Sequence, residues 1–110
     1  MSKYNSRTVQ YLGKTFHSMA ERDYFMYLKS EEQQGRIRDI KLQPSFILQE
    51  TFKKGDKTYR AITYRADFSY ITTSDNKLHV VDRKGYYTEV FKIKHKLFEY
   101  KYPDLKLEIV

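Results

Sequence analysis

The chain has 110 residues, with 21 Lys and Arg against 14 Asp and Glu, which gives a formal net charge of +7. This length suits one domain with a single core, and we see no repeat or interdomain linker, so we expect one domain over residues 1–110. The chain lacks cysteine, a run of about 18 apolar residues and a signal-peptide core, which argues against disulfides, thiolate metal sites and membrane spans and predicts a soluble cytoplasmic protein.

The excess of positive charge is informative about partners. A field of this size on a small domain attracts polyanions, of which nucleic acid is the commonest. The alternative is a basic protein whose charge serves solubility alone. Three scattered histidines without short spacing make a zinc site improbable.

The first 17 residues alternate polar and apolar positions around Leu12–Lys14 and predict a small hairpin or an extended arm, with the core in residues 18–110. Ser18 and Glu21 then have the spacing of a capping box, so a helix should run to about Gln34 and stop at Gly35. Its apolar face contains Tyr24, Phe25 and Leu28.

Glu21 lies on the apolar face of this helix. Two interpretations of this residue are possible from the sequence. Its carboxylate either serves only the capping box or points inward and contributes to a functional site.

Four apolar-rich stretches predict strands: residues 37–42, 46–52, a long strand 58–71, and 78–83. Lys53–Lys57 is a charged turn, and the polar loop 72–77 should close an antiparallel hairpin. On the long strand, alternation places Tyr64 opposite Asp67, so we interpret Tyr64 as a core residue. Arg60 either contacts a phosphate or faces solvent.

The hairpin should bring Asp67 and Asp82 together at one end, where Asp82 and Lys84 share a face of the second strand. Aspartate is depleted in strands. Asp82 and Lys84 therefore form either a solvated strand end or a functional site. Two adjacent carboxylates repel unless a cation lies between them, which is typical of a divalent metal site.

Thr88 should cap a second helix from Glu89 to about Tyr100, with a core stripe of Val90, Ile93 and Leu97. The lysines on its other faces form either a solvated face or a phosphate-contacting surface; they include Lys92, Lys94 and Lys96. Pro103 should end the helix, and the alternation from Leu105 to Ile109 predicts a closing strand.

Taken in order, these motifs resemble the PD-(D/E)xK, or restriction-endonuclease-like, nuclease superfamily. The chain is similar in particular to a small phage- and prophage-associated family described as nuclease or Holliday-junction-resolvase-like. The matching segments are residues 13–21, 42–46, 59–68, 81–85 and 98–103. Ala66 stands where a proline often precedes the first acid, and Asp82 where glutamate is commoner.

The resemblance implies an α/β (α+β) fold in the order α-β-β-β-α-β, with a mixed central sheet flanked by helices. It implies that Asp67 and Asp82 bind Mg²⁺, or Mn²⁺, together with the backbone carbonyl of Arg83. Lys84 would be the catalytic lysine and Glu21 the first-helix acid, which holds a metal-bound water or a second ion. We expect DNA contacts from Arg60 and the lysines of the second helix.

These expectations describe a Mg²⁺-dependent DNA endonuclease, structure-selective for branched or duplex DNA, that acts in phage recombination or replication in the bacterial host. Cutting both strands calls for two active sites, so a homodimer is expected. The alternatives are a non-cleaving DNA-binding or assembly module on the same fold and, with less support from motifs, a basic RNA-binding protein.

Overall fold

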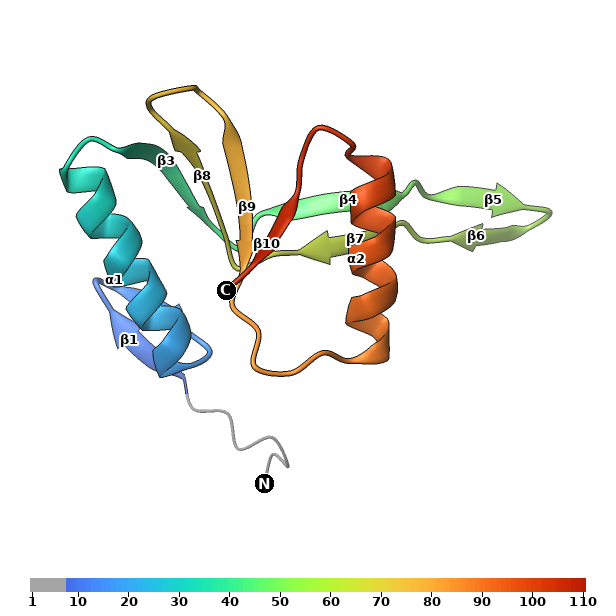
Figure 1. Ribbon diagram of the computed structural model, residues 1–110. Coiled ribbons are helices and arrows are strands. Elements are labelled where there is room, and N and C mark those ends of the chain that lie inside the picture. Colours follow the sequence, from blue (N-terminus) through green and yellow to red (C-terminus); the bar gives the residue numbers. More distant parts are fainter. Residues whose placement is uncertain (1–7) are drawn as a thin grey trace.

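A mixed four-stranded sheet forms the centre of the computed structural model, which describes residues 8–110. Its strand order is β10-β9-β8-β3 (Figure 1). Strands β3, β8 and β9 are antiparallel neighbours, whereas β10 runs parallel to β9. The strands span Ile37–Leu42 (β3), Phe68–Thr72 (β8), Leu78–Asp82 (β9) and Leu107–Ile109 (β10).

One helix packs on each face of this sheet. Because strand side chains alternate, neighbouring residues of β9 enter different cores. Val81 packs in a core with residues of α1 (Met19–Gln33), and Val80 packs with Phe91 and Phe98 of α2 (Glu89–Lys101). Residues 8–110 therefore form an α+β protein with two helices and several small sheets. No helix within residues 8–110 has the length and apolar character needed to cross a membrane.

The first helix begins and ends as its sequence predicts. The Ser18 hydroxyl accepts a hydrogen bond from the backbone N–H of Glu21 at 3.0 Å. At the other end, Gly35 has a φ of +77°, which favours glycine. The N–H groups of Gly35 and Arg36 donate to carbonyls of the last turn at 2.9 and 3.0 Å, which is a Schellman motif.

The predicted N-terminal hairpin is confirmed for the described residues. β1 (Val9–Tyr11) pairs with β2 (Lys14–Phe16) around the Leu12–Gly13 turn, while residues 1–7 of the predicted arm lie outside the described residues. Phe16 anchors the hairpin, because its ring lies 5.1 Å from that of Phe25 on α1.

The prediction of one long strand over residues 58–71 is wrong. This stretch contains the three strands β6 (Lys57–Tyr59), β7 (Ile62–Arg65) and β8. The chain changes partners at Ala66 and Asp67, whose N–H groups donate to the carbonyls of Pro44 (3.1 Å) and Val81 (3.2 Å). The backbone N–H groups of two successive residues thus find hydrogen-bond partners in different parts of the chain. This change of partner interrupts the strand and its alternation of side chains.

The predicted strand over residues 46–52 is likewise divided into two. β4 (Ser45–Gln49) pairs with β7, and β5 (Phe52–Lys54) pairs with β6 around the predicted Gly55 turn. These two ribbons together connect β3 to β8 (Figure 1).

The second helix forms where predicted, but a different face is buried. Thr88 caps it by accepting from the N–H of Phe91 at 3.0 Å. Val90 and Ile93 are 61% and 60% exposed, so the predicted core stripe is wrong for both, and only Leu97 packs partly against the core. Phe91 and Phe98 are buried instead, because aromatic rings seven residues apart on one face remove more apolar area from water.

Candidate functional site

The two aspartates lie at the same end of the central sheet, as the sequence predicts. Phe68, the first residue of β8, pairs with Val81 of β9, so Asp67, directly before β8, lies next to Asp82, the last residue of β9. The side chain of Asp67 accepts a hydrogen bond from the backbone N–H of Arg83 at 2.7 Å. The pairing of β8 with β9 thus fixes the positions of both acids.

The surroundings of Asp67 perturb its ionisation. The pKa of Asp67 is raised from 3.8 to about 8, mainly by burial and then by the hydrogen bond and negative charge of Asp82. The charge of Glu21 adds to the rise, and the N–H of Arg83 opposes it. Without a cation, the pair therefore holds a proton near neutral pH, because a second buried negative charge is costly.

Asp82 is fully buried, with 1% of its surface exposed. Its Oδ2 accepts a hydrogen bond from the Tyr64 hydroxyl and lies 3.4 Å from Nζ of Lys84. The prediction that Asp82 and Lys84 share a face is thus confirmed. The alternative interpretation of Asp82 as part of a solvated strand end is wrong, because Asp82 is buried. Lys84 also lies over the ring of Phe91, 4.5 Å from its centroid.

Tyr64 is a contact of the acid pair that sequence reasoning missed. It is buried, as expected for a core residue, but its hydroxyl reaches Asp82. Burial and this hydrogen bond raise its pKa. The break after β7 invalidates the face assignment that set Tyr64 apart from Asp67. The available signal was chemical, since a buried tyrosine hydroxyl requires a partner.

Glu21 points inward from α1, and only 7% of it is exposed. Its carboxylate accepts from the backbone N–H of His17 at 3.4 Å, one residue before the cap, and its Oε2 lies 3.8 Å from His17 Nδ1. Its negative charge contributes to the raised pKa of Asp67. Glu21 therefore satisfies a backbone N–H at the helix start and points inward, while its role in a functional site stays a prediction.

The donor set suits a hard cation, but it contains few protein ligands. Within residues 8–110, no group of three or more acidic or histidine side chains lies close enough to hold a metal ion. Two carboxylates, those of Asp67 and Asp82, are brought together. No described residue donates a hydrogen bond to the carbonyl of Arg83. Mg²⁺ accepts such sparse oxygen sites because it keeps several waters.

The predicted DNA-contacting residues are dispersed. Arg60 is exposed between β6 and β7, and Lys92 pairs with Glu89 at 3.0 Å. Lys96 is exposed on α2, whereas Lys94 is half-buried beside a hollow of about 490 Å³ that also contacts Ile93. The structure therefore does not gather these residues into one patch around the acids.

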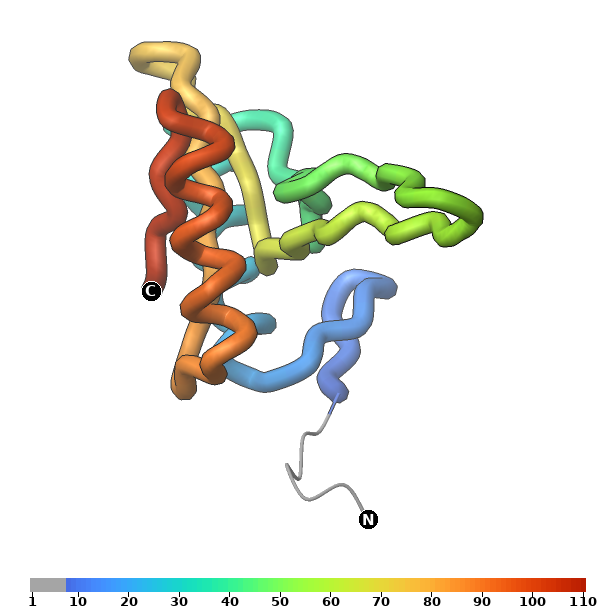
Figure 2. The backbone as a smooth tube through the Cα atoms, turned by 90° about the vertical axis from the view of Figure 1, so that its right-hand side faces the viewer, coloured from blue at the N-terminus to red at the C-terminus, as the bar shows by residue number. Residues whose placement is uncertain are grey.

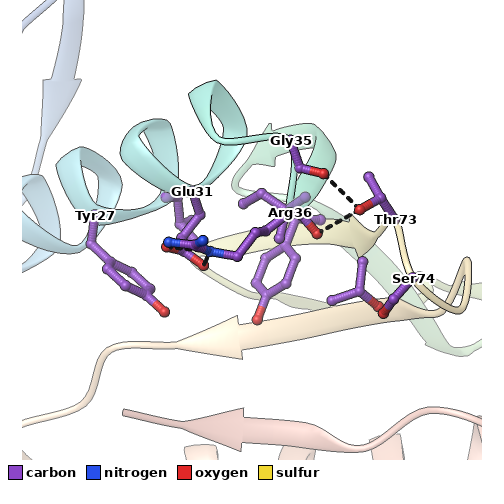
Figure 3. Close-up of a pocket in the computed structure, with 10 residues that line it drawn as sticks. Tyr27, Glu31, Gly35, Arg36, Thr73 and Ser74 are labelled. Atoms are coloured by element: carbon purple, nitrogen blue, oxygen red, sulfur yellow. Dashed lines mark hydrogen bonds and ion pairs between the residues drawn. The ribbon is translucent and has the colours of Figure 1, made fainter.

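A separate hollow of about 420 Å³ lies between α1 and the far end of β8 (Figure 3). The ion pair of Arg36 with Glu31, at 3.1 Å, crosses it, and the Thr73 hydroxyl donates to the carbonyl of Gly35 at 2.7 Å. The β8 residue of its lining nearest to Asp67 in sequence is Tyr70, three residues further on, so the hollow begins roughly 10 Å along the strand from Asp67. None of the acid-pair residues lines it, so it is distinct from the candidate site, and no motif in the sequence predicted it.

No curated protein and no solved structure matches the chain. The family described as "Protein of unknown function (DUF1064)" matches residues 1–110, the whole length. The chain therefore belongs to this DUF1064 family.

Proposed function

We propose that this protein is a metal-dependent DNA endonuclease of the PD-(D/E)xK type. The observation that carries the proposal is the contact of Lys84 Nζ with Asp82 Oδ2 at 3.4 Å, beside Asp67 at the paired ends of β8 and β9. An acid pair and a lysine at one strand end supply the groups that phosphodiester hydrolysis requires. Burial of two like charges without a structural gain favours function over stability.

The order of elements supports the same proposal. The sheet and its two helices follow the chain as α1, β3, β8, β9, α2 and β10, which is the α-β-β-β-α-β order expected for a restriction-endonuclease-like core. The last two strands of this series are parallel and the others antiparallel. Strands β4 to β7 would then be an insertion between the first and second core strands.

Each residue has a role in this proposal. Asp67, Asp82 and the carbonyl of Arg83 would hold Mg²⁺ or Mn²⁺, which supplies Lewis acidity and lowers the pKa of bound water. Lys84 orients the attacking water and stabilises charge on the phosphate. Glu21 positions water from the α1 side. Tyr64 orients Asp82 through its hydroxyl.

We also propose that the enzyme acts as a homodimer on duplex or branched DNA, in phage recombination or replication. Cleavage of both strands requires two active sites, and each chain provides one acid pair. Sedimentation velocity of the purified protein, alone and with duplex DNA, tests the homodimer directly. A dimer is expected, and a monomer in both samples would refute the homodimer.

A non-cleaving DNA-binding module on the same fold is the second candidate. The observation that favours it is the burial of Asp82 beneath Tyr64 and Lys84, which leaves 1% of the aspartate exposed. A metal ion must gain access to this oxygen before cleavage can occur.

Cleavage assays separate the two candidates. Labelled four-way junction, flap, duplex and single-stranded DNA would be incubated with Mg²⁺, Mn²⁺ or EDTA. The chain offers a matched control, because Asp104 and Lys106 form another Asp-x-Lys sequence in which both residues are exposed. Metal-dependent cutting that is lost in Asp82→Ala and kept in Asp104→Ala supports the nuclease. Binding without cutting in any metal supports the second candidate.

A further inference from the structure

The β5–β6 hairpin and its flanks, residues 51–60, form an arm that extends away from the sheet and helices. Figure 2 shows the arm, in green, projecting from the body of the molecule. Every residue of the arm is exposed, and none belongs to either hydrophobic core. Packing in the core therefore does not account for the arm.

The arm concentrates positive charge. It contains Lys53, Lys54, Lys57 and Arg60 against Asp56 alone, so four positive charges and one negative charge leave a net +3 within ten residues. Among the described residues, none of these four cations pairs with a carboxylate. By contrast, Lys92 on α2 is paired with Glu89. The charge of the arm is uncompensated.

Local contacts hold the arm as a regular ribbon. Phe52 and Tyr59 are cross-strand partners whose rings stack at 4.7 Å with an interplanar angle of 8°. Lys57 Nζ lies 5.0 Å from the Tyr59 centroid, and the Ala61 N–H donates to the Thr51 hydroxyl at 3.0 Å where the ribbon joins the body. An ordered ribbon loses less entropy on binding than a flexible loop would.

Side-chain alternation puts the paired residues on a common face. Phe52 and Tyr59 form one cross-strand pair, and Lys54 and Lys57 form the other pair on that same face. Two adjacent lysines are unfavourable opposite one another unless an anion accompanies them. Lysines on an edge strand also prevent aggregation, but that role does not require a pair of like charges.

We propose that this arm is a binding element for duplex DNA, with its cations on the phosphodiester backbone. A two-stranded β-ribbon fits the major groove of B-form DNA, whereas the deep, narrow major groove of A-form RNA excludes it. The inference deepens the proposed nuclease function and rests on it for the identity of the polyanion. It assigns substrate binding to a surface separate from the acid pair.

The test measures binding without cleavage. Fluorescence anisotropy in EDTA would compare a DNA duplex with an RNA duplex of the same length, at several salt concentrations. In the arm variant, the four cations Lys53, Lys54, Lys57 and Arg60 become glutamine. In the control variant, four exposed lysines elsewhere become glutamine: Lys14, Lys41, Lys77 and Lys106. Both variants lower the net charge equally, so a difference in their affinity for DNA shows that the location of the positive charges matters.

The arm variant should bind duplex DNA about 10-fold or more weakly at about 100 mM salt, and its salt slope should fall by up to about 3.6, because each of the four phosphate contacts contributes about 0.9. The control variant should change less than about 3-fold. Equal losses in the two variants would overturn the proposal, as would equal affinity for the RNA duplex.

The outcome is separable from that of the nuclease proposal. If the wild-type protein never cuts DNA but the arm variant alone loses binding, the arm assignment stands and the nuclease proposal fails. If the arm variant binds and cuts like the wild type, the arm assignment fails and the nuclease proposal stands. Circular dichroism of each variant verifies that these exposed substitutions leave the fold intact.

Discussion

Replacing Asp67 with asparagine should stabilise the protein while it abolishes activity. The asparagine carbonyl can keep the hydrogen bond from the Arg83 N–H, and its amide can donate to Asp82 in place of the shared proton. The substitution therefore removes charge and preserves geometry. Active-site acids that are costly to bury are expected to behave in this way.

The size of the expected stabilisation follows from the pKa of Asp67, which is about 8 compared with an ordinary value of 3.8. Each pKa unit corresponds to about 1.4 kcal/mol, which sets a ceiling of about 5 kcal/mol on the cost of ionising this carboxyl group at pH 8. Asp67 is only partly buried and shares its proton with Asp82, so we expect a gain of about 1–3 kcal/mol for Asp67→Asn at pH 8.

The contribution of Asp67 to the free energy of unfolding depends on pH. Because folding raises the pKa of Asp67, its contribution to stability is fully present below about pH 4 and is lost as the pH rises towards 8. The gain from Asp67→Asn should therefore shrink by more than half at pH 5. Urea unfolding in EDTA at both pH values measures it.

Asp75→Asn is the matched control for this prediction. Asp75 is exposed, and its pKa is lowered by hydrogen bonds from the Thr72 hydroxyl and the Lys77 N–H. The same substitution should therefore leave stability unchanged or reduce it. A destabilised Asp67→Asn protein at pH 8, or an equal gain at both pH values, would refute the description of the acid pair.

Three further substitutions test other parts of the structure. Tyr64→Phe removes the hydrogen bond to Asp82 and should lower the cleavage rate by about 10-fold or more while the protein stays folded, as measured by single-turnover kinetics and circular dichroism. Gly35→Ala places a side chain at a φ of +77° and should cost about 1 kcal/mol in urea unfolding. Phe98→Ala should cost about 3–5 kcal/mol, whereas Ile93→Ala on the exposed side of the same helix should cost less than about 1 kcal/mol; similar losses for the two would contradict the observed orientation of α2.

Local chemistry made much of the fold predictable. The Ser18 cap, the Gly35 stop and the Thr88 cap each satisfy backbone groups within a few residues, so their effect can be read from a short stretch of sequence. The β8–β9 hairpin was predictable for the same reason. Because this hairpin fixes Asp67 and Asp82, their proximity followed from the sequence as well.

Tertiary pairing decided what the sequence could not reveal. The stretch from Thr58 to Ile71 alternates like one strand, but its three parts pair with four different strands: β6 with β5, β7 with β4, and β8 with both β3 and β9. That division brings Tyr64 to Asp82. The orientation of α2 was also undetermined, because Val90, Ile93 and Leu97 form as regular a stripe as Phe91 and Phe98, and only the partner surface distinguishes them.

The most direct test of the central claim is the Mg²⁺-dependent cleavage rate of the Lys84→Ala protein beside that of Lys106→Ala, on the DNA that the wild type cuts fastest. The acid pair and Lys84 should act as one site, so Lys84→Ala should reduce the rate by about 100-fold or more, and Lys106→Ala should retain the wild-type rate. If Lys84→Ala cuts as fast as Lys106→Ala, the contact of Lys84 with Asp82 has no catalytic role and the nuclease assignment of this site is wrong.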